Sequence, residues 1–236
     1  IKYSPTEWFS LRASAGKGYR TANAMPENVS MLASGRYLKS NPFTRQQEAA
    51  WNYGLSTSFT LPIGDKSLEL NAEYYYTDFD HQLVVDVDTP QRASLPSSLT
   101  PDLHTIKFHQ LEGESFSHTI QVDATYPILS GFDVTAGFRF SDARTNYEGR
   151  GLVWRPMTSR YKGMLSLSYK SPLELWQFDV TGQLNGPMRL YDNSRSPAFG
   201  QLSAQITREF HYFSIYLGGE NLTNYKMLNP ILHASE

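Results

Sequence analysis

Residues 49–61 read AAWNYGLSTSFTL, and apolar and polar side chains alternate along almost the whole stretch. Trp51, Tyr53, Leu55, Phe59 and Leu61 fall on one face of an extended chain, whereas small polar residues fall on the other. Because successive side chains of a β-strand point to opposite faces, the stretch predicts a strand with one apolar face and one polar face.

The same alternation recurs along most of the chain, as in SLELNAEYYYT at 67–77 and SFSHTIQVDATY at 115–126, and no comparable helical period accompanies it. The pattern predicts an all-β protein of nine strands. These cover 7–15, 49–61, 67–77, 115–126, 132–141, 160–170, 175–186, 200–208 and 212–220.

The connections between these strands alternate in length. Short ones lie at 62–66, 127–131, 171–174 and around 209, and long ones at 17–48, 78–114, 142–159 and 187–198. Tight turns at one end and long loops at the other are typical of a transmembrane barrel, in which tilted strands of about ten residues cross an apolar band roughly 25 Å tall. The sequence therefore predicts an antiparallel up-and-down transmembrane β-barrel segment that contacts outer-membrane lipid.

Aromatic residues support this interpretation, because membrane barrels place them at both lipid–water interfaces. Trp51 and Tyr53 lie toward a long loop, and Tyr126, Tyr169 and Trp176 flank short turns. Two aromatic girdles are expected.

Composition excludes several other classes. In 236 residues, 21 Lys and Arg stand against 23 Asp and Glu, so no general positive charge would attract nucleic acid. The absence of cysteine excludes a disulfide scaffold and a thiolate metal site. No apolar run reaches the roughly 18 residues of a membrane helix.

Nine is an odd number, and bacterial single-chain barrels close with an even number of strands and no open edge. The chain also starts at Ile1 rather than at methionine. We therefore expect a fragment that other strands complete. The third and fourth crossings continue in residues 83–88, which predicts a protruding hairpin with its tip at 89–102.

Several segments resemble the C-terminal half of a TonB-dependent outer-membrane receptor. They are LRASAGKGYR at 11–20, WNYG at 51–54, YYYTDFDHQLV at 74–84, GGENLTNYK at 218–226 and NPILHA at 229–234. The resemblance implies a barrel of about 22 strands, of which residues 1–236 supply the C-terminal part without the plug domain, the TonB box or the final strand. It also implies import of a scarce nutrient, such as a metal chelate, corrinoid, haem or glycan, driven by TonB at the bacterial outer membrane.

Cationic and aromatic residues of the long loops are the candidates for binding a small, anionic nutrient, because binding residues favour loops and arginine stacks on aromatic rings. The candidates are Tyr19, Arg20, Arg36, Tyr37, Arg150, Trp154, Arg189 and Tyr191.

Charged residues on the polar faces are expected to line the lumen, since charges are costly on the lipid face. These residues are Arg12, Glu73, Asp123, Arg139 and Asp179. They either contact the plug and a passing substrate or neutralise one another in a network along the wall.

Metal and cofactor sites are not predicted. His104 and His109 are five residues apart and would point to opposite faces of a strand. Asp78, Asp80, Asp86 and Asp88 are weak candidates for calcium, because they lack the spacing of a calcium-binding loop.

Catalytic motifs such as a Gly-x-Ser-x-Gly elbow, a phosphate-binding loop or HExxH are absent, so the sequence indicates a protein that is not an enzyme. Two alternatives remain at this point. One is an outer-membrane barrel hydrolase with catalytic residues far apart in the sequence, and the other is a soluble β-sandwich or adhesin-like module.

Overall fold

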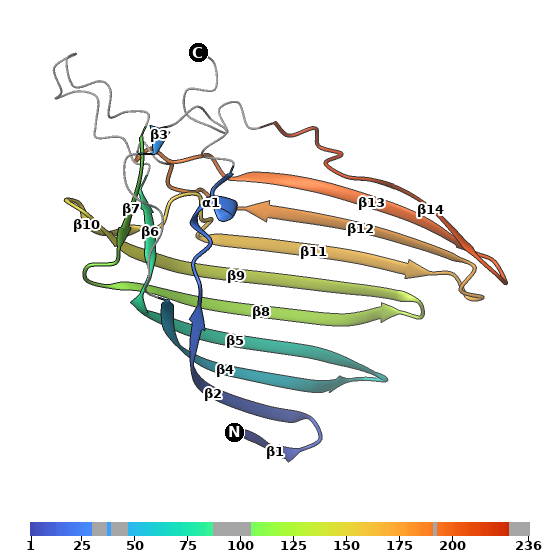
Figure 1. Cartoon of the computed structure of the whole chain (residues 1–236). Helices are drawn as coiled ribbons and strands as arrows, with labels where there is room; N and C mark the ends of the chain where they lie inside the picture. Colours follow the sequence, from blue (N-terminus) through green and yellow to red (C-terminus); the bar gives the residue numbers. More distant parts are fainter. Residues whose placement is uncertain (30–36, 39–46, 87–104, 191–192, 227–236) are drawn as a thin grey trace.

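A computed structural model of the chain describes residues 1–29, 37–38, 47–86, 105–190 and 193–226. An 11-stranded sheet dominates it, with neighbouring strands in the order β1-β2-β4-β5-β8-β9-β11-β12-β13-β14 and β10 paired to β9 (Figure 1). Its strands are β1 (Lys2–Thr6), β2 (Phe9–Arg20), β4 (Glu48–Ile63), β5 (Lys66–His81), β8 (Ser115–Leu129), β9 (Phe132–Tyr147), β10 (Gly151–Trp154), β11 (Tyr161–Lys170), β12 (Trp176–Asn185), β13 (Phe199–Glu209) and β14 (Ser214–Gly219).

All nine predicted strands are present, and each pairs antiparallel with its neighbour along the chain. The start of the first predicted strand, 7–15, was wrong, because Glu7 and Trp8 form a turn and the strand begins at Phe9. Strand β1 was not predicted. It has only five residues, one of them Pro5, and they show no sustained alternation.

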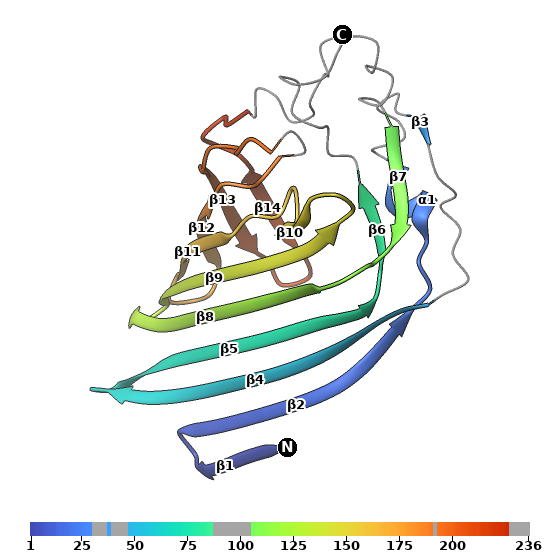
Figure 2. The same cartoon turned by 90° about the vertical axis from the view of Figure 1, so that its left-hand side faces the viewer.

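The alternation of short turns and long connections is confirmed, with the long connections gathered at one edge of the sheet (Figure 1). The predicted loops begin too early, however. Strand β2 continues to Arg20, β5 to His81 and β9 to Tyr147, so residues expected in loops extend the wall of the sheet. This wall is curved in both views (Figure 2).

Strand register joins the apolar faces into one continuous surface. One row runs across five strands through Leu55, Tyr74, Ile120, Phe140 and Tyr161. Within the described part of the chain no second sheet covers this surface, and many of its large side chains are exposed. The fold is therefore a single curved layer, which contradicts the β-sandwich alternative.

Both predicted aromatic girdles are formed on this apolar surface. Toward the long loops, the ring of Tyr76 stacks on His118 at 4.7 Å, and the Tyr74 hydroxyl lies 2.9 Å from Nδ1 of His118. Toward the short turns, Tyr169 and Trp176 both stack on Phe178, at 6.3 Å in each case.

A second, three-stranded sheet lies at the long-loop edge, in the order β3-β7-β6 (Figure 1). It comprises β3 (Tyr37–Leu38), β6 (Leu83–Asp86) and β7 (Thr105–Gln110). The predicted hairpin is thus confirmed, but it leaves the main sheet after His81. Its predicted tip at 89–102 lies outside the described residues.

The small sheet packs on a short helix, α1 (Ala24–Glu27), that follows β2. Ala24, Ile106 and Phe108 form its buried core, with Leu83 and Val85 packed against them. We call this unit, formed by α1, β3, β6 and β7, the crown. Nowhere in the described residues is there a helix of the length and apolarity that a membrane crossing needs.

Candidate functional site

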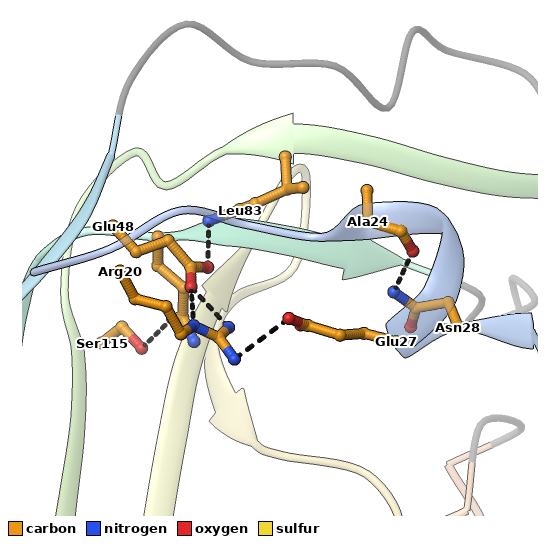
Figure 3. Close-up of polar contacts among 8 residues, drawn as sticks. Arg20, Ala24, Glu27, Asn28, Glu48, Leu83 and Ser115 are labelled. Atoms are coloured by element: carbon orange, nitrogen blue, oxygen red, sulfur yellow. Dashed lines mark hydrogen bonds and ion pairs between the residues drawn. The ribbon is translucent and has the colours of Figure 1, made fainter.

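The crown is attached to the wall by a group of ion pairs at the end of β2 (Figure 3). The Arg20 guanidinium donates from Nε and Nη2 to Oε2 of Glu48, at 2.7 Å and 2.5 Å, and it also lies 3.2 Å from Glu27 in α1. The other carboxylate oxygen of Glu48 accepts a hydrogen bond from the backbone N–H of Leu83, at 3.0 Å. These contacts connect β2, α1, β4 and β6. The hydrogen bonds to Glu48 also raise the pKa of Arg20.

A second connection runs from the crown to the end of β9. Arg150 forms an ion pair with Asp86 of β6 at 2.5 Å, and its guanidinium lies 5.0 Å from the ring of Tyr147. Arg189 lies 6.0 Å from the same ring. Tyr147 is only 4% exposed, so one buried ring connects two loop arginines.

Another group of arginines lies around the ring of Trp154. The guanidinium groups of Arg160, Arg195 and Arg144 lie 4.3, 5.2 and 5.6 Å from its ring. A fourth arginine, Arg189, donates from Nε to the Trp154 carbonyl oxygen at 2.6 Å. We call Trp154 with Arg144, Arg160 and Arg195 the outer cationic cluster.

Strand register places these two groups on opposite faces of the wall. Strand β10 pairs with β9 so that Trp154 is opposite Arg144 and Gly151 is opposite Tyr147. Along β9, Arg144 has the parity of the apolar Phe138 and Phe140, whereas Tyr147 has the parity of the polar-face Arg139. Trp154 therefore lies on the side of the apolar surface and Tyr147 on the polar side.

A pocket of about 220 Å³ adjoins the outer cationic cluster. Phe140 and Tyr161 of the apolar surface line it together with three arginines, Arg160, Arg189 and Arg195. Tyr161 lies over Gly186, because a Cβ at that glycine would be 2.9 Å from the ring atoms. The pocket is thus adjacent to the apolar face of the main sheet.

The structure distributes the predicted ligand-binding residues among several places. Tyr19 and Arg20 lie in β2 rather than in a loop, and Arg20 is held by Glu48. Arg150 and Arg189 meet at Tyr147, while Trp154 faces the other side. Tyr37 is part of β3. Arg36 and Tyr191 lie outside the described residues.

Arg195 is one of the cations of the predicted loop at 187–198, whereas Arg144 and Arg160 of the same cluster were missed by the sequence prediction. Arg144 could have been found by continuing the alternation of β9 beyond Ser141, because it keeps the parity of Phe138 and Phe140. No pattern in the sequence could have revealed Arg160, since its position depends on how the chain returns from β10 to β11.

All five predicted lumen residues lie on the polar face. Cross-strand pairing places three of them in one row on this face. Ser56 lies between Arg12 and Glu73, and Gln121 lies between Glu73 and Arg139. Asp123 accepts a hydrogen bond from Gln121 at 2.8 Å, and Asp179 accepts one from Ser168 at 2.7 Å.

No ion pair joins these five residues to one another or to other charged groups of the described chain. The five ion pairs found there lie at the long-loop end of the wall instead. A hollow of about 900 Å³ covers the polar face of β11 to β14 and includes Asp179, Gln183, Gln201 and Glu220 in its lining. The predicted neutralising network is therefore not formed by direct ion pairs.

The acidic residues proposed for calcium do not converge. Asp80 pairs with Lys17 and Asp86 with Arg150, in two different sheets. Asp78 is opposite Trp51 in β4, and Asp88 lies outside the described residues. In the ranges that the structure describes, no group of three or more His, Asp or Glu side chains could hold a metal ion.

A curved antiparallel wall with an exposed apolar face, a polar reverse, two aromatic girdles and all long connections at one edge defines a segment of a transmembrane β-barrel. Its edge strands, β1 and β14, do not pair with each other in the described chain.

Comparison with known proteins places this segment in a family. Residues 1–222 match the family model "TonB dependent receptor-like, beta-barrel", and the chain belongs to this family of outer-membrane proteins. A search of curated proteins found no match.

Solved structures of the same architecture include a mutant of the ferric enterobactin receptor PfeA of Pseudomonas aeruginosa. Its sequence is 14% identical to this chain, and the TM-score is 0.62. The match covers 94% of this chain and 34% of the PfeA chain. The copper transporter OprC has 13% identity and a TM-score of 0.67, over 94% and 32%. The FrpB iron transporter of Neisseria meningitidis has 15% identity and a TM-score of 0.63, over 95% and 33%. The chain thus spans about one third of the length of these structures.

Proposed function

We propose that this chain is the C-terminal part of the barrel of an outer-membrane receptor that binds a scarce nutrient outside the cell and imports it with energy from TonB. The observation that carries the proposal is the match of the family model to residues 1–222 on a wall whose long connections all gather at one edge. The plug domain and the TonB box would belong to other parts of the same receptor.

A metal ion or metal chelate is the nutrient class that we favour. The similar structures include a copper transporter, an iron transporter and a receptor for ferric enterobactin. The crown supports binding at the long-loop edge, because the Arg20–Glu48 and Arg150–Asp86 ion pairs fix its position against the wall. Tyr19, Arg36, Tyr37, Arg150, Arg189 and Tyr191 remain the proposed contacts with the nutrient.

We assign contact with the plug to the polar face of the wall. Arg12, Glu73 and Arg139 form no ion pairs within the described chain, so their charges are available to a domain packed in the lumen. Replacing Arg139 with Ala should then weaken retention of the plug, measured as release of a separately expressed plug domain, more than it weakens nutrient binding. Unchanged plug retention would contradict this assignment.

Growth under metal limitation tests the import function. A strain that depends on the complete receptor should grow on its nutrient only when both the receptor and TonB are present. Uptake of a panel of labelled metal chelates and free metal ions would identify the nutrient. Uptake that continues without TonB would contradict the proposed energy source. Hydrolysis of a peptide or lipid substrate by the purified receptor would favour the hydrolase alternative instead.

A further inference from the structure

The outer cationic cluster is on the wrong side of the wall for a nutrient that enters the lumen. Trp154 and Arg144 have the parity of the apolar surface. The Arg160 guanidinium lies 5.6 Å from the ring of Phe140, which lies on the apolar surface in the same row as Tyr74. The cluster therefore borders the surface that meets lipid.

Two buried hydrogen-bond donors at this cluster have no acceptor. Nε1 of Trp154 and Nε of Arg160 are both inaccessible to solvent, and neither has a hydrogen-bond partner in the described chain. Buried donors of this kind are costly unless a bound group satisfies them. Both donors belong to residues that line the 220 Å³ pocket.

The charge of the cluster is also incompletely balanced. Asp142 pairs with Arg144 through two hydrogen bonds, at 3.1 Å and 3.0 Å. Arg160 and Arg195 form no ion pair with any carboxylate of the described residues. Two positive charges and two unsatisfied donors therefore surround one small pocket, which is a suitable environment for an oxyanion.

The height of the cluster on the wall identifies the source of that oxyanion. Arg144 is four residues beyond Phe140 in β9, so it lies about 13 Å farther along the strand and about 10 Å farther along the membrane normal at the usual tilt. The polar headgroup layer begins where the apolar band ends and is roughly 5–8 Å thick on each side. Long arginine side chains can bend back into that layer.

We propose that the outer cationic cluster binds a phosphate group of an outer-leaflet lipid, with Arg160 and Arg195 supplying the charge and Trp154 a further N–H donor. This inference rests on the proposed function only in requiring that the wall face lipid. It assigns Trp154 to the lipid rather than to the nutrient, and it concerns a site outside the lumen.

Native mass spectrometry of the complete receptor in detergent micelles tests the proposal with two probes, diphosphoryl lipid A and its dephosphorylated form. The wild-type receptor should bind the phosphorylated lipid more tightly. The double variant Arg160→Gln, Arg195→Gln should lose about tenfold or more in affinity for that lipid alone, since each charge-assisted hydrogen bond corresponds to roughly that factor. The control variant Arg155→Gln removes an exposed arginine of the connection that also contains Arg160, and it should behave as wild type.

Trp154→Phe provides a second variant that keeps an aromatic side chain and removes the Nε1 donor together with part of the ring area. It should weaken binding of the phosphorylated lipid by a few-fold and leave the other lipid unaffected, which keeps the test decisive if the double variant does not fold. Equal binding of both lipids by wild type and variants overturns the proposal. Loss of nutrient binding with unchanged lipid binding also overturns it and assigns the pocket to the nutrient.

Failure of TonB-driven uptake would contradict the proposed function without affecting this result, because lipid binding is measured at equilibrium and needs no transport.

Discussion

An arginine placed on the apolar face at mid-membrane should destabilise the barrel far more than one placed next to it on the polar face. Val122 is suitable because it lies near the middle of β8, between Ala72 of β5 and Phe138 of β9 on the apolar surface, and is 36% exposed. A cationic side chain at the midplane of a barrel costs about 2–4 kcal/mol. Val122→Arg should therefore lower the ratio of folded to unfolded receptor by between about 30-fold and about 1,000-fold.

The matched control is Gln121→Arg, one residue earlier on the polar face. Register places Gln121 between Glu73 and Arg139, and the Gln121 side chain also contacts Asp123, so the new charge meets two carboxylates and one guanidinium. We expect a change within about 0.5 kcal/mol, as for most surface substitutions. The assay is guanidinium unfolding of the complete receptor in lipid vesicles, followed by tryptophan fluorescence. Equal destabilisation by the two variants, or a larger effect of Gln121→Arg, would refute the assignment of faces.

Two further predictions concern close packing and the attachment of the crown. Gly186→Ala should lower the guanidinium midpoint by the equivalent of about 1 kcal/mol, because the added Cβ would lie 2.9 Å from the Tyr161 ring. Gly182→Ala, where the nearest atom would be 4.0 Å away, should have a smaller effect, and the reverse order would contradict the packing described here. Glu48→Gln removes the ion pair that holds Arg20, so trypsin should cleave after Arg20 about two- to fivefold faster, consistent with a partly exposed pair worth roughly 0.5–1 kcal/mol. Unchanged cleavage, measured by mass spectrometry of the fragments, would show that this ion pair does not hold the segment.

Strand positions could be predicted because alternation depends only on which residues face lipid and which face the lumen. That requirement holds for each residue of a crossing, as in 49–61, and so it leaves a clear pattern. The alternation weakens above the membrane, where water contacts both faces of the strand. The predicted strand ends were therefore too early at Arg20, His81 and Tyr147.

The candidate sites were harder to predict because they depend on contacts between segments far apart in the sequence. Trp154 and Arg150 belong to the same predicted loop, yet the pairing of β10 with β9 turns them toward opposite sides. The departure of β6 from the main sheet after His81 likewise separates Asp80 from Asp86. Residue type alone identified arginines and aromatic rings as important, but it could not assign them to a face.

Spin labels along β8 test the central claim of this account most directly. The chain contains no cysteine, so a nitroxide can be attached to single cysteines introduced one at a time at positions 119 to 124 of the complete receptor in vesicles. Collisions with oxygen, which dissolves in lipid, should be frequent at 120, 122 and 124. Collisions with a water-soluble nickel chelate should be more frequent at 119, 121 and 123. Absence of this alternation, or protection of the even positions from both reagents, would show that the apolar face packs against protein rather than lipid.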